Sequence, residues 1–183
     1  MKKIIKLHKQ ILIATLFLCS FSTMDAQVQR NFWGLELGRS TKEDVKRFLF
    51  AKGLEYNNSV GGYDVIEVNG EAELSLGGYK WTPFFRFHNN ILYFITLLRF
   101  PIDMTSSGEF YDVNTKFIFH DLRSKLNGKY YNLEDPIREK SQTRYARRDT
   151  QTVVDMILDD ENSLFLNYYD RKLTRAAECG NDL

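Results

Sequence analysis

Sequence motifs of metal and nucleophilic chemistry are missing from this chain. It contains only three histidines, and those outside the N-terminal region, His88 and His120, have no HExxH or CxxC spacing around them. No Gly-x-Ser-x-Gly elbow occurs, and residues 159–162 (Asp-Asp-Glu-Asn) lack the spaced carboxylates and the glycine of a calcium loop. We therefore expect no catalytic residue, no cofactor and no bound metal.

A long hydrophobic run is also lacking. The longest apolar stretch covers residues 11–19, loosely extended to Phe21, whereas a membrane-spanning helix needs about 20 residues. Four lysines precede this stretch, and a short segment of small and polar residues follows it and ends at Ala26. This order is typical of a signal peptide that is cleaved between Ala26 and Gln27. The sequence predicts a signal peptide over residues 1–26, a periplasmic or secreted protein, and no transmembrane segment after cleavage.

Cysteine is scarce, since Cys19 and Cys179 are the only two in the chain. Cleavage after Ala26 removes Cys19 and leaves Cys179 without an intramolecular partner, so we expect a fold that does not depend on a disulfide. An alternative makes Cys19 the lipidated first residue of a lipoprotein, although Phe17 and Leu18 before it are bulkier than such signals favour. Cys179 is expected to be an exposed thiol, with an intermolecular disulfide as the alternative.

Excess positive charge is absent from the chain that remains after cleavage. The formal net charge of the whole chain is +1, and loss of the leader removes four lysines and one aspartate, which leaves about −2. Nucleic-acid binders neutralise phosphates with a basic surface, so nucleic acid is not an expected partner. An exposed strand edge accounts for the densest basic stretch, and a patch for an acidic partner or a lipid headgroup is the alternative. This stretch consists of Arg138, Lys140, Arg144, Arg147 and Arg148.

The sequence does contain the pattern of an α+β protein. Residues 40–43 (Ser-Thr-Lys-Glu) match a capping box, and the spacing of apolar residues predicts a helix over 41–52 that ends at Gly53. Strand-like segments follow, joined by Asn-Gly and Asn-Asn turns that favour hairpins. The expected strands are residues 63–68, 71–76, 82–88 and 91–100, the first two joined at Asn69 and Gly70 and the last two at Asn89 and Asn90.

The second half of the chain repeats this order. A helix capped by Asp112 or Asn114 and ended by Gly128 precedes three strands, and Gly128 lies 75 residues after Gly53. We therefore predict two tandem repeats, each a helix followed by an antiparallel β-meander, that form one compact unit. The first repeat covers residues 27–104 and the second residues 105–183, with residues 101–111 as the natural link. The strands of the second repeat are expected at residues 144–148, 152–158 and 163–169.

The opening of the chain resembles a known group of exported domains. The residues concerned are 32–38 (Phe-Trp-Gly-Leu-Glu-Leu-Gly), Ser40, Glu43 and Val45, followed by the strand-like residues 81–87. Together with the repeat order, they are similar to β-lactamase-inhibitor-protein-like domains and to related small lipoproteins of outer-membrane assembly. The resemblance implies a non-enzymatic envelope module that binds proteins. This chain departs from the group in lacking a disulfide and a convincing lipidation motif.

Aromatic and aliphatic residues are abundant enough to supply both faces of a sheet. Strict alternation would place Phe85, Phe87, Tyr93 and Ile95 on one side, and Phe84, Leu92, Phe94 and Leu98 on the other. These segments are either central strands covered on both faces or strands that present an apolar surface to a partner. Aromatic residues with a polar tip also occur at expected strand and loop ends, where they suit interface anchors. The candidate partner-binding residues are Trp33, Tyr79, Trp81, Tyr130 and Tyr131.

The sequence favours a function in binding. The absence of catalytic motifs and the surplus of aromatic residues lead to the hypothesis of an exported, non-enzymatic envelope protein that binds a protein or peptide. One alternative is a hydrolase of envelope polymers, which would need a cleft with two carboxyl groups of shifted pKa. Another is a small-ligand carrier with an apolar pocket between sheet and helices. The oligomeric state is not predicted.

Overall fold

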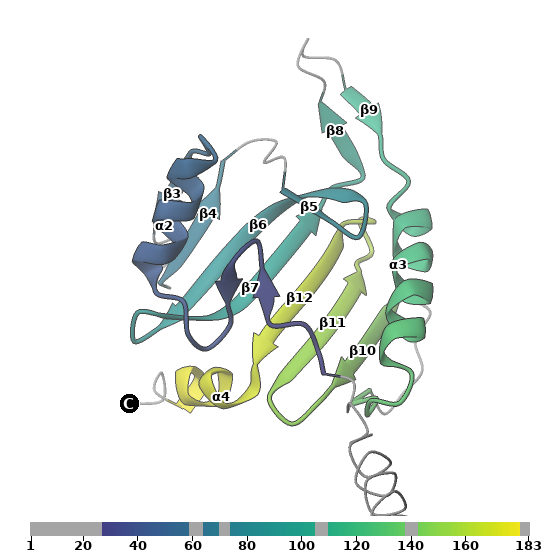
Figure 1. Cartoon of the computed structure of the whole chain (residues 1–183). Coiled ribbons are helices and arrows are strands. Elements are labelled where there is room, and N and C mark those ends of the chain that lie inside the picture. Colours follow the sequence, from purple (N-terminus) through teal and green to yellow (C-terminus); the bar gives the residue numbers. More distant parts are fainter. Residues whose placement is uncertain (1–26, 59–63, 70–73, 105–109, 138–142, 180–183) are drawn as a thin grey trace, which may run out of the picture.

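The computed structural model describes residues 27–58, 64–69, 74–104, 110–137 and 143–179. Within these ranges the protein is α+β, as predicted, with three helices and a mostly antiparallel arrangement of strands (Figure 1). The predicted signal peptide, Gly70 of the predicted turn, and Arg138 and Lys140 lie outside the described residues. The helices are α2 (Lys42–Ala51), α3 (Thr115–Tyr130) and α4 (Arg171–Cys179).

One antiparallel sheet of eight strands forms the body of the molecule. From one edge to the other its strands are β10 (Arg144–Arg148), β11 (Thr152–Leu158), β12 (Leu164–Asp170), β7 (Ile91–Arg99), β6 (Tyr79–His88), β4 (Val65–Val68) and β3 (Tyr56–Asn58), with β5 (Leu74–Leu76) also paired to β6. The last strands that the two halves contribute to this sheet, β7 and β12, pair with each other in its middle. The centre of the sheet is therefore built by contacts between residues about 70 positions apart in sequence.

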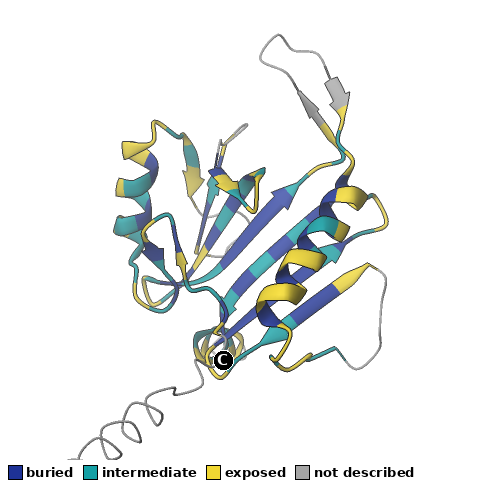
Figure 2. Ribbon diagram, turned by 45° about the vertical axis from the view of Figure 1, so that its right-hand side comes forward, coloured by how far each residue is buried: buried dark blue, intermediate teal, exposed yellow. Residues whose placement is uncertain are grey.

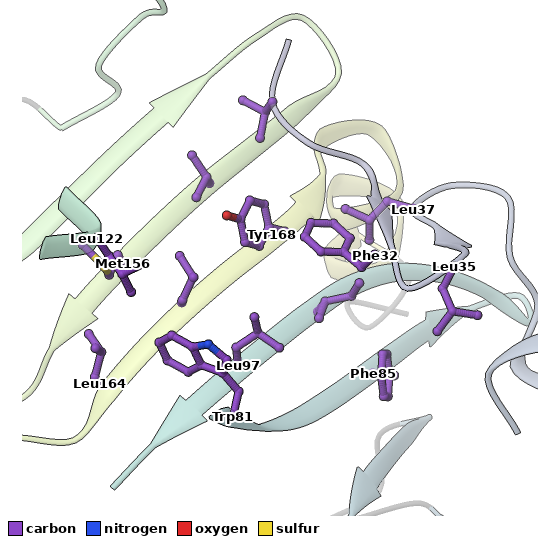
Figure 3. Close-up of a cluster of buried hydrophobic side chains, with 14 of the residues drawn as sticks. Phe32, Leu35, Leu37, Trp81, Phe85, Leu97, Leu122, Met156, Leu164 and Tyr168 are labelled. Atoms are coloured by element: carbon purple, nitrogen blue, oxygen red, sulfur yellow. The ribbon is translucent and has the colours of Figure 1, made fainter. Parts of the chain in front are cut away.

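One face of the sheet carries the hydrophobic core. Figure 1 shows α2, α3 and the N-terminal segment lying over this face. The N-terminal segment contains a small hairpin, β1 (Asn31–Phe32) and β2 (Leu35–Glu36). Its Phe32 ring lies 4.6 Å from the ring of Tyr168 on β12, and Figure 3 shows both inside the cluster. Figure 2 shows the exposed residues of α3 on its outer side and buried residues along the strands beneath it. The sheet residues of this core include Trp81, Phe85, Ile95, Leu97, Met156, Leu166 and Tyr168.

A bulge corrects part of the face assignment that alternation predicts. The register between β6 and β7 shifts between Arg86 and Phe87, so that Arg86 lies opposite Phe94 but Phe87 lies opposite Leu92. Tyr93 is the extra residue. Leu92 consequently joins the buried core on the covered face, rather than the row of Phe94, and Tyr93 is only partly buried. Simple alternation fails here because a single extra residue reverses the side on which every earlier residue of β7 lies.

The capping box of α2 lies one residue later than the sequence predicts. Thr41, not Ser40, is the N-cap, and it exchanges hydrogen bonds with Asp44 rather than with Glu43. Ser40 Oγ instead accepts a hydrogen bond from the backbone amide of Glu36 at 2.8 Å, which holds the preceding turn. The predicted C-terminal stop is confirmed, since Gly53 has a φ of 67°, in the left-handed region that glycine adopts freely.

The predicted end of α3 is wrong. Asn114 is the N-cap, and its side chain accepts a hydrogen bond from the amide of Phe117. The helix then continues through Gly128 to Tyr130. Tyr130 is only 1% exposed, and burial of this large side chain on the last helical turn more than offsets the weak helix propensity of one glycine.

Several further features were not predicted from the sequence, among them the short strands β1, β2 and β3. The hairpin β8 (Ile102–Met104) and β9 (Phe110–Asp112) occupies the predicted link between the halves, and α4 follows β12 where no helix was expected. The expected hairpin across Asn69 is wrong, because β4 and β5 do not pair with each other. Both pair with β6 instead, one after the other along the same edge. The ten-residue length of β6 allows both short strands to bind there.

None of the helices in the described part of the chain is long and apolar enough to cross a membrane.

Candidate functional site

Two of the five candidate anchors belong to the core. Trp81 and Tyr130 are each 1% exposed. The indole of Trp81 donates a hydrogen bond to the carbonyl of Leu76 at 2.9 Å, and the Tyr130 hydroxyl accepts one from the amide of Gln29 at 3.1 Å. Neither ring is accessible to a partner in this structure, because each packs inside the molecule and uses its polar atom to fix a neighbouring segment.

The other three candidates lie nearer the surface but do not form one patch. Trp33 sits at the β1–β2 turn with a φ of 54°, and its indole donates to the carbonyl of Ser75 at 3.1 Å. Tyr79 is half-buried, and its hydroxyl donates to Asp121 on α3 at 2.8 Å. Tyr131, just beyond the C-terminal end of α3, is 80% exposed. Asp121 and Tyr131 are ten positions apart, which corresponds to about 15 Å along a helix axis, so Tyr131 is separated from Tyr79.

The described arginines of the basic stretch are paired with carboxylates. Arg144 donates two hydrogen bonds of 3.1 Å to Asp155 on the adjacent strand. Arg147 bonds to Asp135 at 2.7 Å, and Arg148 is paired with Glu134. The three arginines lie on the edge strand β10, as the sequence predicts, and their charges are compensated by these nearby carboxylates.

The sheet face opposite the core is the most distinctive surface of the molecule. Side chains alternate along each strand, so the neighbours of the buried core residues point to this second face. Phe84, Phe94 and Phe165 lie on it and remain partly exposed. Their strands are the three central ones, whose backbone groups are paired on both sides. The rings therefore stand on a rigid support.

A hollow of about 440 Å³ lies at the centre of this face, which we call the open-face hollow. It is lined by Phe84, Arg86, Phe94, Thr96, Leu98, Ile157, Phe165 and Asn167. The register explains its shape. Thr96 and Asn167 are cross-strand neighbours in one row, between the row of Phe94 and the row that pairs Leu98 with Phe165. Because their side chains are shorter than those of the two flanking rows, the surface dips between them.

A stack of three side chains borders the hollow on one side. The guanidinium carbon of Arg86 lies 5.0 Å from the centre of the Phe94 ring, and that ring lies 5.0 Å from the Tyr169 ring at an interplanar angle of 9°. The three residues face one another across β6, β7 and β12. Burial, followed by the negative charges of Asp155 and Glu178, raises the pKa of Tyr169, so the phenol stays neutral at physiological pH.

Carboxyl groups with a shifted pKa lie elsewhere and are shifted downward. Hydrogen bonds lower the pKa of Asp44 (from Thr41), of Asp121 (chiefly from Lys125) and of Glu134 (from Arg148). This direction is opposite to the raised pKa of a carboxylic acid that donates a proton in catalysis. Among the described residues, no three His, Cys, Asp or Glu side chains converge in a way that could hold a metal ion.

Sequence reasoning found part of this site. It placed Phe84, Phe94 and Leu98 on one side of the sheet and considered an apolar surface there. It missed the contribution of β11 and β12, because the pairing of β12 with β7 joins the two halves of the chain and has no local signal. In comparisons with protein-family models, curated proteins and solved structures, this chain finds no match.

Proposed function

We propose that this protein is exported to the periplasm or secreted, and that it binds a protein or peptide partner in the cell envelope without catalysing a reaction. The open-face hollow is the observation that carries the binding part of this proposal. Contiguous apolar surface on one side of a domain is costly to leave in water, and such patches commonly mark interaction sites.

The rigidity of the open face supports a binding role. Its aromatic side chains are mounted on central strands, and Phe94 is further held between Arg86 and Tyr169. A partner that docks there orders few side chains, so the entropic cost of association is small. Aromatic residues fixed in this way supply large contact areas, which is typical of interface hot spots.

We also propose that the two halves arose by tandem duplication, in keeping with the resemblance to β-lactamase-inhibitor-protein-like domains. Each half contains a helix followed by antiparallel strands, α2 with β3 to β7 and α3 with β10 to β12. The final strands of the halves meet as an antiparallel pair at the centre of the sheet, which supports an approximate two-fold relation.

Site-specific photocrosslinking tests the binding proposal. The photoreactive amino acid p-benzoylphenylalanine replaces Phe165 on the open face, and in a control it replaces Phe50 on α2, which is 85% exposed. Both variants carry the same probe on the same full-length chain and differ only in its location. Illumination of cells that produce each variant is followed by gel analysis and mass spectrometry of the adducts.

A discrete adduct from position 165 that is absent from position 50 is the expected result. Addition of Arg86→Gln or Phe84→Ser to the position-165 variant should reduce this adduct if the partner covers the hollow. Equal adducts from both positions would show non-specific contact and contradict the proposal, as would the absence of adducts from position 165 in correctly exported protein.

A small-ligand carrier is the second candidate, because the hollow is lined mainly by apolar side chains and is large enough for a small molecule. The hydrolase alternative has no comparable support, since the carboxyl groups with shifted pKa values in the described part of the chain are each lowered by a separate hydrogen-bond donor.

A further inference from the structure

We propose that the open-face hollow selects a peptide segment in which a carboxylate lies next to a bulky apolar side chain, with Arg86 binding the carboxylate. This inference rests on the proposed function and deepens it by stating the chemistry of the partner. It is carried by three features of the hollow: an arginine that forms no ion pair with the described residues, a ring that orients that arginine, and two polar side chains between the apolar rows.

The guanidinium group of Arg86 has no carboxylate within ion-pair distance among the described residues. Arg86 is exposed and forms no ion pair within them, whereas Arg144, Arg147 and Arg148 of the same sheet each have a carboxylate partner. A guanidinium presents its N–H donors in a planar fork that matches a carboxylate in a bidentate pair. A ligand that brings a carboxylate to the border of the hollow would supply the missing partner.

The Phe94 ring orients Arg86 for this contact. The guanidinium carbon lies 5.0 Å from the centre of the ring, which in turn stacks on Tyr169. Cation–π contact uses the flat face of a guanidinium and leaves the N–H groups at its edge free to donate. Because the side chain is already ordered by this contact, binding a carboxylate costs little additional entropy.

The polar side chains between the apolar rows favour a peptide over an alkyl chain. Thr96 is 8% exposed and offers a hydroxyl group, and Asn167 beside it offers both an amide donor and an amide acceptor. A peptide group can satisfy both sides of the Asn167 amide. An alkyl chain would cover these atoms without bonding to them, which is unfavourable for buried polar groups. Phe84, Phe165 and Leu98 then contact the bulky side chain of the peptide.

An array of acetylated, amidated pentapeptides Ala-Z-X-Z-Ala tests the inference. Each position Z is Phe, Leu or Ile, and X is Glu, Gln, Asp, Asn or Lys, so that each carboxylate peptide has an uncharged partner of almost the same shape. Binding is measured for the wild-type protein and for Arg86→Gln and Arg86→Lys. Arg39→Gln removes an arginine that is 78% exposed at a different place and serves as the matched control. Circular dichroism confirms the fold of each variant.

We expect the best Glu or Asp peptides to bind about tenfold more tightly than their Gln or Asn partners, as one charge-assisted hydrogen-bonded pair would produce. Arg86→Gln should remove this preference, Arg86→Lys should retain only part of it because the fork is lost, and Arg39→Gln should leave it unchanged. Equal binding of Glu and Gln peptides, or an unchanged preference in Arg86→Gln, would overturn the inference while leaving peptide binding intact. If no peptide binds and sodium laurate does, both the inference and the proposed peptide function are wrong.

Discussion

At the scale of single residues, two tryptophans that look equivalent in the sequence have different roles. Trp81 is buried among core residues of several elements, whereas Trp33 lies at a turn and stacks on Phe48 of α2. Both use the indole N–H to bind the backbone of β5 or its end, at Leu76 and Ser75. The difference is therefore one of packing, and it predicts a difference in stability.

Trp81→Ala should lower the free energy of unfolding by about 3–5 kcal/mol, because it removes a large buried side chain and leaves a cavity. Trp33→Ala should cost clearly less, since its ring is only partly buried. Urea denaturation followed by far-UV circular dichroism measures both values. Similar losses for the two variants would contradict the assignment of Trp81 to the core.

The buried hydroxyl of Tyr145 leads to a second testable prediction about stability. It is 3% exposed, its hydroxyl has no hydrogen-bond partner among the described residues, and burial raises its pKa to about 12. Because the folded-state pKa lies above the unfolded value of about 10, the unfolded chain loses this phenol proton first. The free energy of unfolding is therefore independent of Tyr145 ionisation below pH 10 and falls as the pH rises from 10 toward 12.

Tyr145→Phe should therefore be more stable than wild type by about 1 kcal/mol at pH 7, since it removes an unsatisfied buried hydroxyl. It should also lose less stability between pH 10 and 12. Tyr168 provides a comparison with Tyr145. Burial raises the pKa of Tyr168 further, so the folded protein loses this proton only at still higher pH. A variant that is less stable at pH 7 would mean that the Tyr145 hydroxyl is hydrogen-bonded in solution.

At the scale of elements, the capping box of α2 shows the limit of a sequence motif. Residues 40–43 match the pattern, but the helix begins one residue later and uses Thr41 and Asp44. Both choices satisfy the same spacing in the sequence. Ser40 determines which residue is the N-cap, because its hydroxyl already accepts a hydrogen bond from the amide of Glu36 in the preceding turn.

Replacing the two acidic residues of this turn separately distinguishes the registers. Asp44→Asn should destabilise the protein at pH 7, because it weakens the hydrogen bonds with Thr41 and the ion pair with Arg47. The same bonds lower the pKa of Asp44, so the stability that they provide is present above the unfolded pKa of about 4 and is lost as the pH falls through the lower folded value. Glu43→Gln should have little effect, since it removes only a surface ion pair with Lys46. Thermal melts between pH 2 and 7 measure both, and a larger effect of Glu43→Gln would support the earlier register.

At the scale of the whole molecule, the N-terminal segment joins the two halves. The amide of Val28 donates to Asp149 at 2.7 Å, and that of Gln29 donates to the hydroxyl of Tyr130 at 3.1 Å. Arg30 bonds to Thr152 and Asp170. These contacts begin at Val28, the second residue after the predicted cleavage site.

If the predicted signal peptide is cleaved, the protein should begin at Gln27, and cleavage there leaves every one of these contacts intact. Mass spectrometry of the intact protein purified from the envelope or the medium measures its N-terminus. A chain that begins at a lipidated Cys19 would support the lipoprotein alternative, and an intact Met1 would contradict the predicted signal peptide.

Much of this architecture is determined by the sequence alone. Helical spacing predicted α2 and α3, and turn residues predicted the β6–β7 hairpin at Asn89 and Asn90, both of which have the positive φ that Asn tolerates. These features depend on neighbours within a few residues, so a single sequence is enough to find them. The α+β class and the mostly antiparallel strands follow from the same local patterns.

Only the tertiary structure decided which side of each strand is covered and where the open-face hollow lies. One bulge reversed the side of Leu92, and the long-range pairing of β7 with β12 placed Thr96 beside Asn167 and Phe94 beside Tyr169. The central parts of β6, β7, β11 and β12 are rich in apolar residues on both faces of the sheet. Hydrophobicity alone therefore does not decide which face is buried. Packing of α2, α3 and the N-terminal segment against one face makes that choice, because a sheet buries the face that its covering elements can reach.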